Sequence, residues 1–65
     1  MYRLSKTTLS VDLGSTKAVM IPEGEIITVG DRTTPDHRMM TVVWRGRDLM
    51  IFRQDLRRAQ IVAES

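Results

Sequence analysis

The chain has 65 residues, a net charge of +2 and no cysteine. This length fits one small domain, and the lack of cysteine excludes disulfides, thiolate metal sites and cysteine nucleophiles. No apolar run approaches the roughly 18 residues of a membrane span, and the first residues lack the apolar core of a signal peptide. We therefore expect residues 1–65 to form one complete, soluble domain in a bacterial-type cytoplasm, without membrane contact.

Apolar residues recur with a period near two through most of the chain, which indicates strands instead of helices. The first hairpin is expected from TLSVDL and KAVMI, residues 8–13 and 17–21, joined by a loop at residues 14–16. A proline and a glycine then interrupt the pattern before EIITV, residues 25–29, which predicts a third strand. The polar segment at residues 30–38 predicts the longest loop.

Two registers are open to the first hairpin. We favour the register that pairs Val11 with Val19, because it aligns β-branched residues. That register also sends Leu9 and Ile21 to the core-facing side of the hairpin. A tighter, two-residue turn would instead pair Val11 with Ala18.

Residues 39–52 form the clearest unit, in which MMTVVW and RDLMIF flank a tight turn at Gly46. Glycine supplies the positive φ that such a hairpin demands, whether the turn lies on residues 45–46 or 46–47. Either turn leaves the two faces of the hairpin unchanged. The face expected in the core carries Met40, Val42, Trp44, Leu49 and Ile51.

The last part of the chain predicts one short turn and one short strand. QDLRRA, residues 54–59, is too brief for an independent helix and predicts a helical or 3₁₀ turn, with Leu56 closing one end of the sheet. AQIV, residues 59–62, predicts the last strand, and residues 64–65 are expected to fray. About five short strands predict a small all-β domain, and closure into a barrel would remove edges that invite aggregation.

Two segments carry a resemblance to known proteins. VVWRGRDLMIFRQDL, residues 42–56, resembles the distal hairpin and the following 3₁₀ turn of SH3-like barrels. The whole chain is similar to short uncharacterised bacterial proteins that pair IPxGxxITV with WxGRxxMxFxxDL, here residues 21–29 and 44–56. The resemblance implies a small SH3-like barrel but no particular activity, because such barrels bind peptides, RNA, DNA or other subunits.

The stretch VDLGSTKAVMI, residues 11–21, resembles the phosphate-binding hairpin of actin-like ATPases and sugar kinases. Those enzymes need two large lobes around the nucleotide, and this chain is several times too short for them. Residues 14–17 also lack the first glycine and the GK[ST] order of a Walker loop. We therefore interpret the stretch as a hairpin turn.

The sequence offers little support for catalysis. His37 is the only histidine and lies in a polar loop, where Asp31 and Asp36 provide no recognised metal-ligand spacing. Glu23 and Glu25 flank a turn, and the interior of so small a barrel is filled by side chains, which leaves no enclosed pocket for an acid–base pair. We assign no catalytic residue, metal, cofactor or small-molecule substrate.

The second face of the long hairpin is also apolar, although one face of a monomeric barrel should meet water. Strong strand curvature could fold part of this face over the core. Otherwise the face is an interface with another protein or with a second copy in a homo-oligomer, because methionine and phenylalanine are enriched at interfaces. The predicted interface residues are Met39, Val43, Met50 and Phe52.

A basic cluster near the end of the chain supports an alternative function, nucleic-acid binding through phosphate contacts. Asp48 and Asp55 oppose this cluster, and the small net charge favours a solvated rim. The candidate residues are Arg45, Arg47, Arg53, Arg57 and Arg58.

Overall fold

The computed structural model describes residues 1–32, 34 and 36–62. Two residues of the predicted loop at 30–38 and the predicted frayed end therefore lie outside the described residues. Strands dominate the described part of the chain, which confirms the all-β prediction. The elements are β1 (Tyr2–Arg3), β2 (Thr8–Asp12), β3 (Ala18–Ile21), β4 (Ile26–Val29), β5 (Met39–Trp44), β6 (Arg47–Phe52), α1 (Arg53–Arg57) and β7 (Gln60–Ile61).

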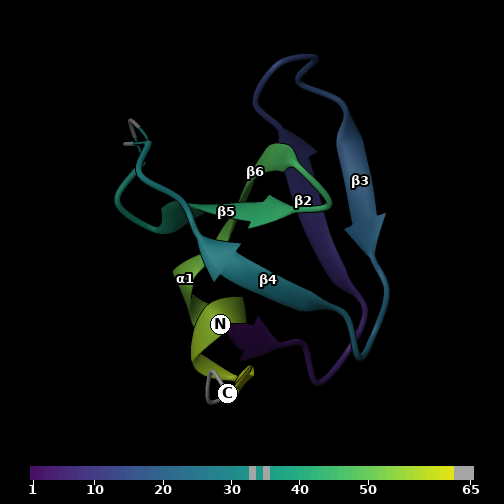
Figure 1. Cartoon of the computed structure of the whole chain (residues 1–65). Coiled ribbons are helices and arrows are strands. Elements are labelled where there is room, and N and C mark those ends of the chain that lie inside the picture. Colours follow the sequence, from purple (N-terminus) through teal and green to yellow (C-terminus); the bar gives the residue numbers. More distant parts are fainter. Residues whose placement is uncertain (33, 35, 63–65) are drawn as a thin grey trace.

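The strands form one antiparallel sheet in the order β3-β2-β6-β5-β4-β1-β7. Figure 1 shows β4 running beside β5, with the β2–β3 hairpin standing to one side and α1 near both ends of the chain. In the described part of the chain β3 and β7 remain as edges, so the sheet curls without closing. The described residues thus form seven strands, where the sequence predicts about five.

Strand β1 is the element that the sequence did not indicate. It pairs with β4 on one side and with β7 on the other. The pairing continues past the strand, because the Leu4 amide donates to the Glu25 carbonyl at 3.0 Å and the Gly24 amide donates to the Leu4 carbonyl at 2.9 Å. Two residues are too few to show an alternating pattern, so β1 has no signal in the sequence.

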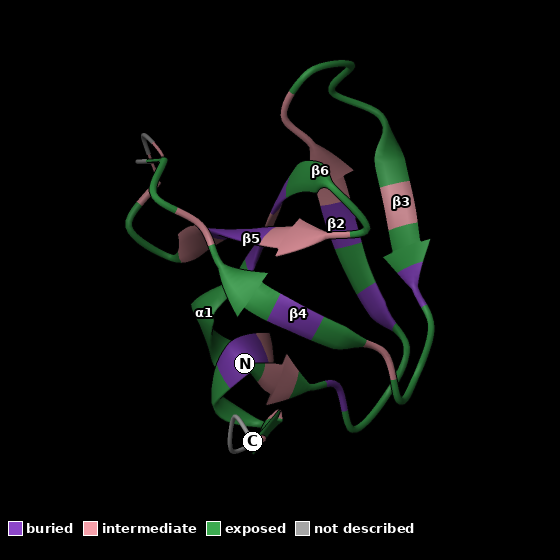
Figure 2. Cartoon of the chain, in the orientation of Figure 1, coloured by how far each residue is buried: buried purple, intermediate pink, exposed green. Residues whose placement is uncertain are grey.

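The core lies between the curled sheet and α1, and Figure 2 shows buried segments on β2, β4, β5 and α1. The predicted core face of the long hairpin is confirmed, with Met40 and Trp44 packed at its margin. Leu56 of α1 closes the core as predicted. The buried apolar residues are Leu4, Ile21, Ile27, Val42, Leu49, Ile51 and Leu56.

The turn of the long hairpin lies on Arg45 and Gly46, which have φ values of 51° and 76°. Two consecutive positive φ values define a type I′ turn, the turn whose twist matches that of the flanking strands. In the register set by this turn, Trp44 lies opposite Arg47, and the pairing continues to Met39 opposite Phe52 at the other end of the hairpin. The predicted positive φ at the glycine is confirmed.

The favoured register of the first hairpin is wrong, because Val11 lies opposite Ala18 and Ser10 lies opposite Val19. The connecting loop has four residues, closed by the Thr16 amide donating to the Asp12 carbonyl at 2.8 Å. A shift of one residue on one strand moves its side chains to the opposite face of the sheet.

The shifted register buries the hydroxyl groups of Thr8 and Ser10 on the side of β2 where Leu9 was expected. Ser10 and Thr8 face the core, and Leu9 points outward with 48% of its surface exposed. The Ser10 hydroxyl donates to the Val19 carbonyl at 2.7 Å, and the Thr8 hydroxyl donates to the Lys6 carbonyl at 3.0 Å. Both hydroxyls are hydrogen-bonded, so their burial carries no large desolvation penalty. The prediction that Leu9 lies in the core is therefore wrong, whereas the prediction for Ile21 is confirmed.

Candidate interaction surfaces

Apolar residues line the outer side of β3, β2, β6 and the start of β5. Val11 lies opposite Met50, and Leu9 lies two residues along β2 on the same side of the sheet as Val11. Three of these side chains are about half exposed: Leu9 at 48%, Met20 at 55% and Phe52 at 44%. We define the outer apolar patch as Leu9, Val11, Met20, Met39, Met50 and Phe52.

Three of the four predicted interface residues belong to this patch. Met39 and Phe52 face one another across β5 and β6, and Met50 lies between Val11 and Thr41. The sequence did not indicate Leu9 and Met20 because the favoured register assigned Leu9 to the core. The exposed Leu9–Met20 pair extends the patch to the edge strand β3.

Val43, the fourth predicted interface residue, lies apart from the patch, opposite Asp48 on β6 and Thr28 on β4. Buried Thr41 separates Val43 from the patch, and its hydroxyl donates to the Arg32 carbonyl at 2.7 Å. The polar loop after β4 therefore crosses the outer face at this point.

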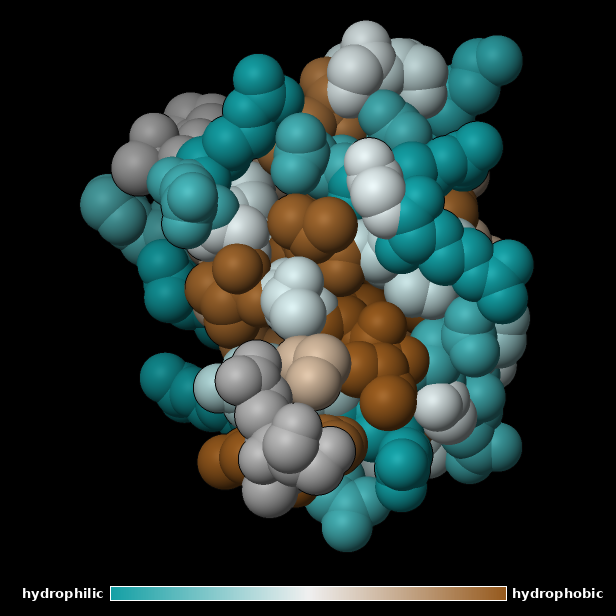
Figure 3. Space-filling view, in the orientation of Figure 1, coloured by the Kyte–Doolittle hydropathy of each residue, from teal (hydrophilic) through white to brown (hydrophobic). Residues whose placement is uncertain are grey.

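A second apolar area surrounds β4, on the face of the molecule shown in Figure 3. The exposed apolar residues of β4 are Ile26, with 41% of its surface exposed, and Val29, with 48%. Val43 adjoins this area through its pairing with Thr28.

The candidate nucleic-acid residues divide between two places. Arg45 and Arg47 lie at the tip of the long hairpin, whereas Arg53, Arg57 and Arg58 follow the opposite end of β6. The length of β6, about 17 Å at the usual rise per residue, separates the two groups. Their closeness in the sequence therefore does not make one compact basic surface.

Arg45 is held by a local cluster. Its Nη2 donates to the Glu25 carboxylate at 3.0 Å, and its guanidinium carbon lies 4.9 Å from the centre of the Trp44 ring. The Trp44 Nε1 donates to the same Glu25 oxygen at 3.1 Å. Arg45 thus covers Trp44, whose ring packs against the core instead of standing open for stacking.

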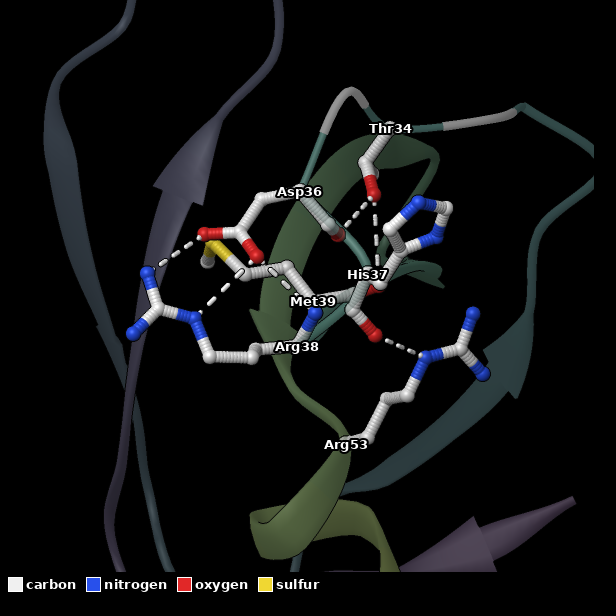
Figure 4. Close-up of polar contacts among 6 residues, drawn as sticks. All are labelled: Thr34, Asp36, His37, Arg38, Met39 and Arg53. Carbon is white, nitrogen blue, oxygen red and sulfur yellow. Dashed lines mark hydrogen bonds and ion pairs between the residues drawn. The ribbon is translucent and has the colours of Figure 1, made fainter.

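The loop before β5 is fastened by its own polar groups, as Figure 4 shows. Asp36 accepts hydrogen bonds from the Nη2, Nε and main-chain N of Arg38, between 2.9 and 3.2 Å. The Arg38 side chain, followed by its amide, lowers the pKa of Asp36. Arg53 joins the loop to α1, because its Nε donates to the His37 carbonyl at 2.7 Å and its amide donates to the Arg38 carbonyl at 2.8 Å.

The DLGST turn binds its own carboxylate. Asp12 Oδ1 accepts hydrogen bonds from the amides of Ser15 and Gly14 at 3.1 and 2.7 Å. These two bonds, that of Ser15 foremost, lower the pKa of Asp12. The amides that could have gripped a phosphate are occupied within the loop, in keeping with a hairpin turn.

No three histidine, aspartate or glutamate side chains of the described residues come together in a way that could hold a metal ion. Within residues 1–32, 34 and 36–62, no helix has the length and apolar character needed to cross a membrane.

Comparison of this chain with protein-family models, with curated proteins and with solved structures finds no match.

Proposed function

We propose that this protein is a non-catalytic interaction module of the cytoplasm that self-associates through the outer apolar patch. The observation that carries the proposal is the joint exposure of Leu9, Met20 and Phe52 on one side of adjoining strands. Even partial burial of an exposed side chain such as Met20 would help a domain of 65 residues, because a large apolar side chain contributes about 1.5–3 kcal/mol when it is fully buried. Methionine is well suited to such a contact because its flexible thioether adapts to the opposing surface.

A second copy of the chain is the partner that suits the edge strand β3 best. The Lys17 carbonyl bonds to the Asp12 amide, so alternation along the antiparallel ladder directs the main-chain groups of Ala18 and Met20 away from β2. An antiparallel β3–β3 pair with Val19 on the two-fold axis would let Ala18 of each copy exchange hydrogen bonds with Met20 of the other. Two-fold dimers use the same surface on both copies, which this arrangement satisfies.

The paired edges would also bring the two patches together. Met20 lies on the edge strand itself, so it would stand opposite Ala18 of the other copy, and the outer faces of the two sheets would join into one apolar face. Pairing would cover one of the two sheet edges, and an exposed edge is a site of uncontrolled aggregation.

The SH3-like relationship is part of the proposal. It is supported by the order of elements after residue 38, in which a tight hairpin leads into one short helix and a short final strand. The open edges at β3 and β7 differ from a closed barrel. In this proposal, association through β3 replaces barrel closure as the means of covering an edge.

The molar mass in solution tests the proposal, measured by sedimentation over a range of protein concentrations. We expect the native chain to form dimers and Met20→Lys to shift it towards the monomer. Ile61→Lys is the matched control, because Ile61 is an exposed apolar residue, at 76%, on the opposite edge strand β7. A native chain that stays monomeric at all concentrations contradicts the proposal, as does an equal effect of both substitutions.

A further inference from the structure

Two hollows meet at the loop before β5. One has a volume of about 460 Å³ and lies over the junction of Gly30 with Thr41. The other, of about 450 Å³, lies between the same loop and α1. His37 and Arg53 line both hollows, so the two spaces share a wall. We call the pair the His37–Arg53 hollow.

The lining of this hollow is strongly basic. Arg32 and Arg53 border the first space, and Arg38, Arg53 and Arg57 border the second. None of the described lining residues is an aspartate or a glutamate. Two of these arginines already have acidic partners, because Arg38 lies 3.1 Å from Asp36 and Arg32 lies 4.0 Å from Asp48, so Arg53 and Arg57 carry the uncompensated charge among the described lining residues. Several cations around one concave space attract an anion, because their potentials add.

Arg53 is held in position to receive an anion. Its main-chain amide and its Nε are both bonded to loop carbonyls, of Arg38 and His37. In the described part of the chain no ion pair or hydrogen bond engages its two terminal amino groups. Figure 4 shows this guanidinium and the His37 ring extending to the same side of the loop, away from the Asp36–Arg38 pair.

The chemistry of the hollow matches a phosphate group. A planar guanidinium presents a fork of donors that fits two phosphate oxygens at once. Each volume falls within the range of about 300–1,000 Å³ that is usual for small-ligand sites. Val29 and Met39 add apolar surface to the first space. We propose that the His37–Arg53 hollow binds a phosphate-bearing anion, with the Arg53 fork holding the phosphate.

The proposal is tested by NMR titration of the native chain with inorganic phosphate, a 5′-mononucleotide and a short single-stranded oligonucleotide, at matched ionic strength. We expect saturable shifts at the signals of His37 and Arg53 with at least one of the first two ligands. Arg53→Lys keeps the charge but loses the fork, and should weaken binding about tenfold, the effect of losing one charge-assisted hydrogen bond. Arg47→Gln, at the far tip of the hairpin, is the control and should leave binding unchanged.

A second variant guards against loss of structure, because Arg53 also fastens the loop. Arg57 lines the hollow, and no hydrogen bond of its side chain is found among the described residues. Arg57→Gln should weaken binding while leaving the thermal unfolding midpoint unchanged. The Met20→Lys variant should show the same phosphate-induced changes in its NMR signals as the native chain. This result would show that phosphate binding does not depend on self-association.

The ligand series distinguishes the sources of phosphate. Equal affinity for phosphate and the mononucleotide indicates a site for the free anion, and tighter binding of the mononucleotide indicates a phosphate ester. The proposal is overturned if neither phosphate nor the mononucleotide, at millimolar concentration, shifts the NMR signals of His37 and Arg53. The proposal is also overturned if Arg47→Gln and Arg57→Gln weaken oligonucleotide binding equally. Such a result would indicate a diffuse basic surface instead of a site at the hollow.

Discussion

Ser10 and Val19 face one another across β2 and β3, and the Ser10 hydroxyl donates to the Val19 carbonyl at 2.7 Å inside the core. This pair fixes which side of β2 is buried. With Ser10 inward, Leu9 points outward and joins the outer apolar patch. One buried hydroxyl thus connects the register of the hairpin to the surface on which the proposed function depends.

The register predicts a contrast between two leucines. Leu49→Ala should destabilise the protein by about 2–5 kcal/mol, because Leu49 is fully buried and its loss leaves a cavity. Leu9→Ala should change the free energy of unfolding by less than about 1 kcal/mol, because the side chain is half exposed. Denaturant unfolding at low protein concentration measures both. If Leu9→Ala lowered the free energy of unfolding as much as Leu49→Ala, the result would contradict the observed register and would favour the register with Leu9 in the core.

The contrast between the two hairpins explains how far the sequence predicts this fold. The long hairpin has a glycine at its turn, and either possible turn leaves its two faces unchanged, so its core face was predicted correctly. In the first hairpin the apolar residues Leu9 and Val11 suggest one face, whereas hydrogen bonds of Asp12 and Ser10 select the other. Satisfied hydroxyl groups decide this register, and a hydrophobic pattern does not report them.

Thr16 carries a backbone strain that a substitution can remove. Its φ is 59°, in the left-handed region that a β-branched residue adopts only at a cost of about 1–2 kcal/mol. Thr16→Gly removes this strain, but glycine also makes the unfolded chain more flexible, which opposes part of the gain. The net effect should be a rise of about 1 kcal/mol in the free energy of unfolding. Thr16→Ala retains a Cβ atom at the same φ and should stabilise much less. Equal effects of the two substitutions would argue against strain at this turn.

Trp44 is the only tryptophan of the chain, so its fluorescence should report on the hydrogen bond with the Glu25 carboxylate. Glu25→Ala removes the acceptor of Trp44 Nε1 and the partner of Arg45, so we expect a loss of about 1 kcal/mol and a red shift of the fluorescence. Glu25→Gln keeps an oxygen that can accept the indole hydrogen bond, and should shift the fluorescence less. Unchanged emission in Glu25→Ala would show that this carboxylate does not hold the ring.

Acid should weaken the fold through two aspartates. The pKa values of Asp12 and Asp36 lie below the usual value of an aspartate, because each carboxylate accepts hydrogen bonds within its loop. The folded state therefore binds fewer protons than the unfolded state in mild acid. Its added stability is present above a pH of about 4, the ordinary aspartate pKa, and is lost as the pH falls through the lowered pKa values.

Denaturant unfolding measured at neutral pH and near pH 3 checks this dependence. We expect the native chain to lose stability in acid and Asp12→Asn to lose less, since the amide does not titrate. Asp31→Asn is the control, and no hydrogen bond involving its side chain is found among the described residues. A native chain with equal stability at both pH values would contradict the assigned hydrogen bonds.

The candidate sites were predictable only in part. The alternation of Met39, Met50 and Phe52 indicated an apolar outer face, and the structure adds Leu9 and Met20 to it. The sequence named Arg53 and Arg57 as candidate phosphate-contact residues but did not indicate the His37–Arg53 hollow, because the hollow depends on loop carbonyls that position Arg53. Spacing along the chain suggested one basic cluster, whereas a strand of extended backbone separates its two halves.

Amide hydrogen exchange at β3 is the most direct test of self-association through this edge. The Met20 amide points away from β2, whereas the Val19 amide lies in a pair bonded to Ser10. We predict that Met20 becomes protected as the protein concentration rises and loses that protection on dilution, while Val19 stays protected throughout. Rapid exchange of Met20 at every concentration would contradict the proposed β3–β3 interface.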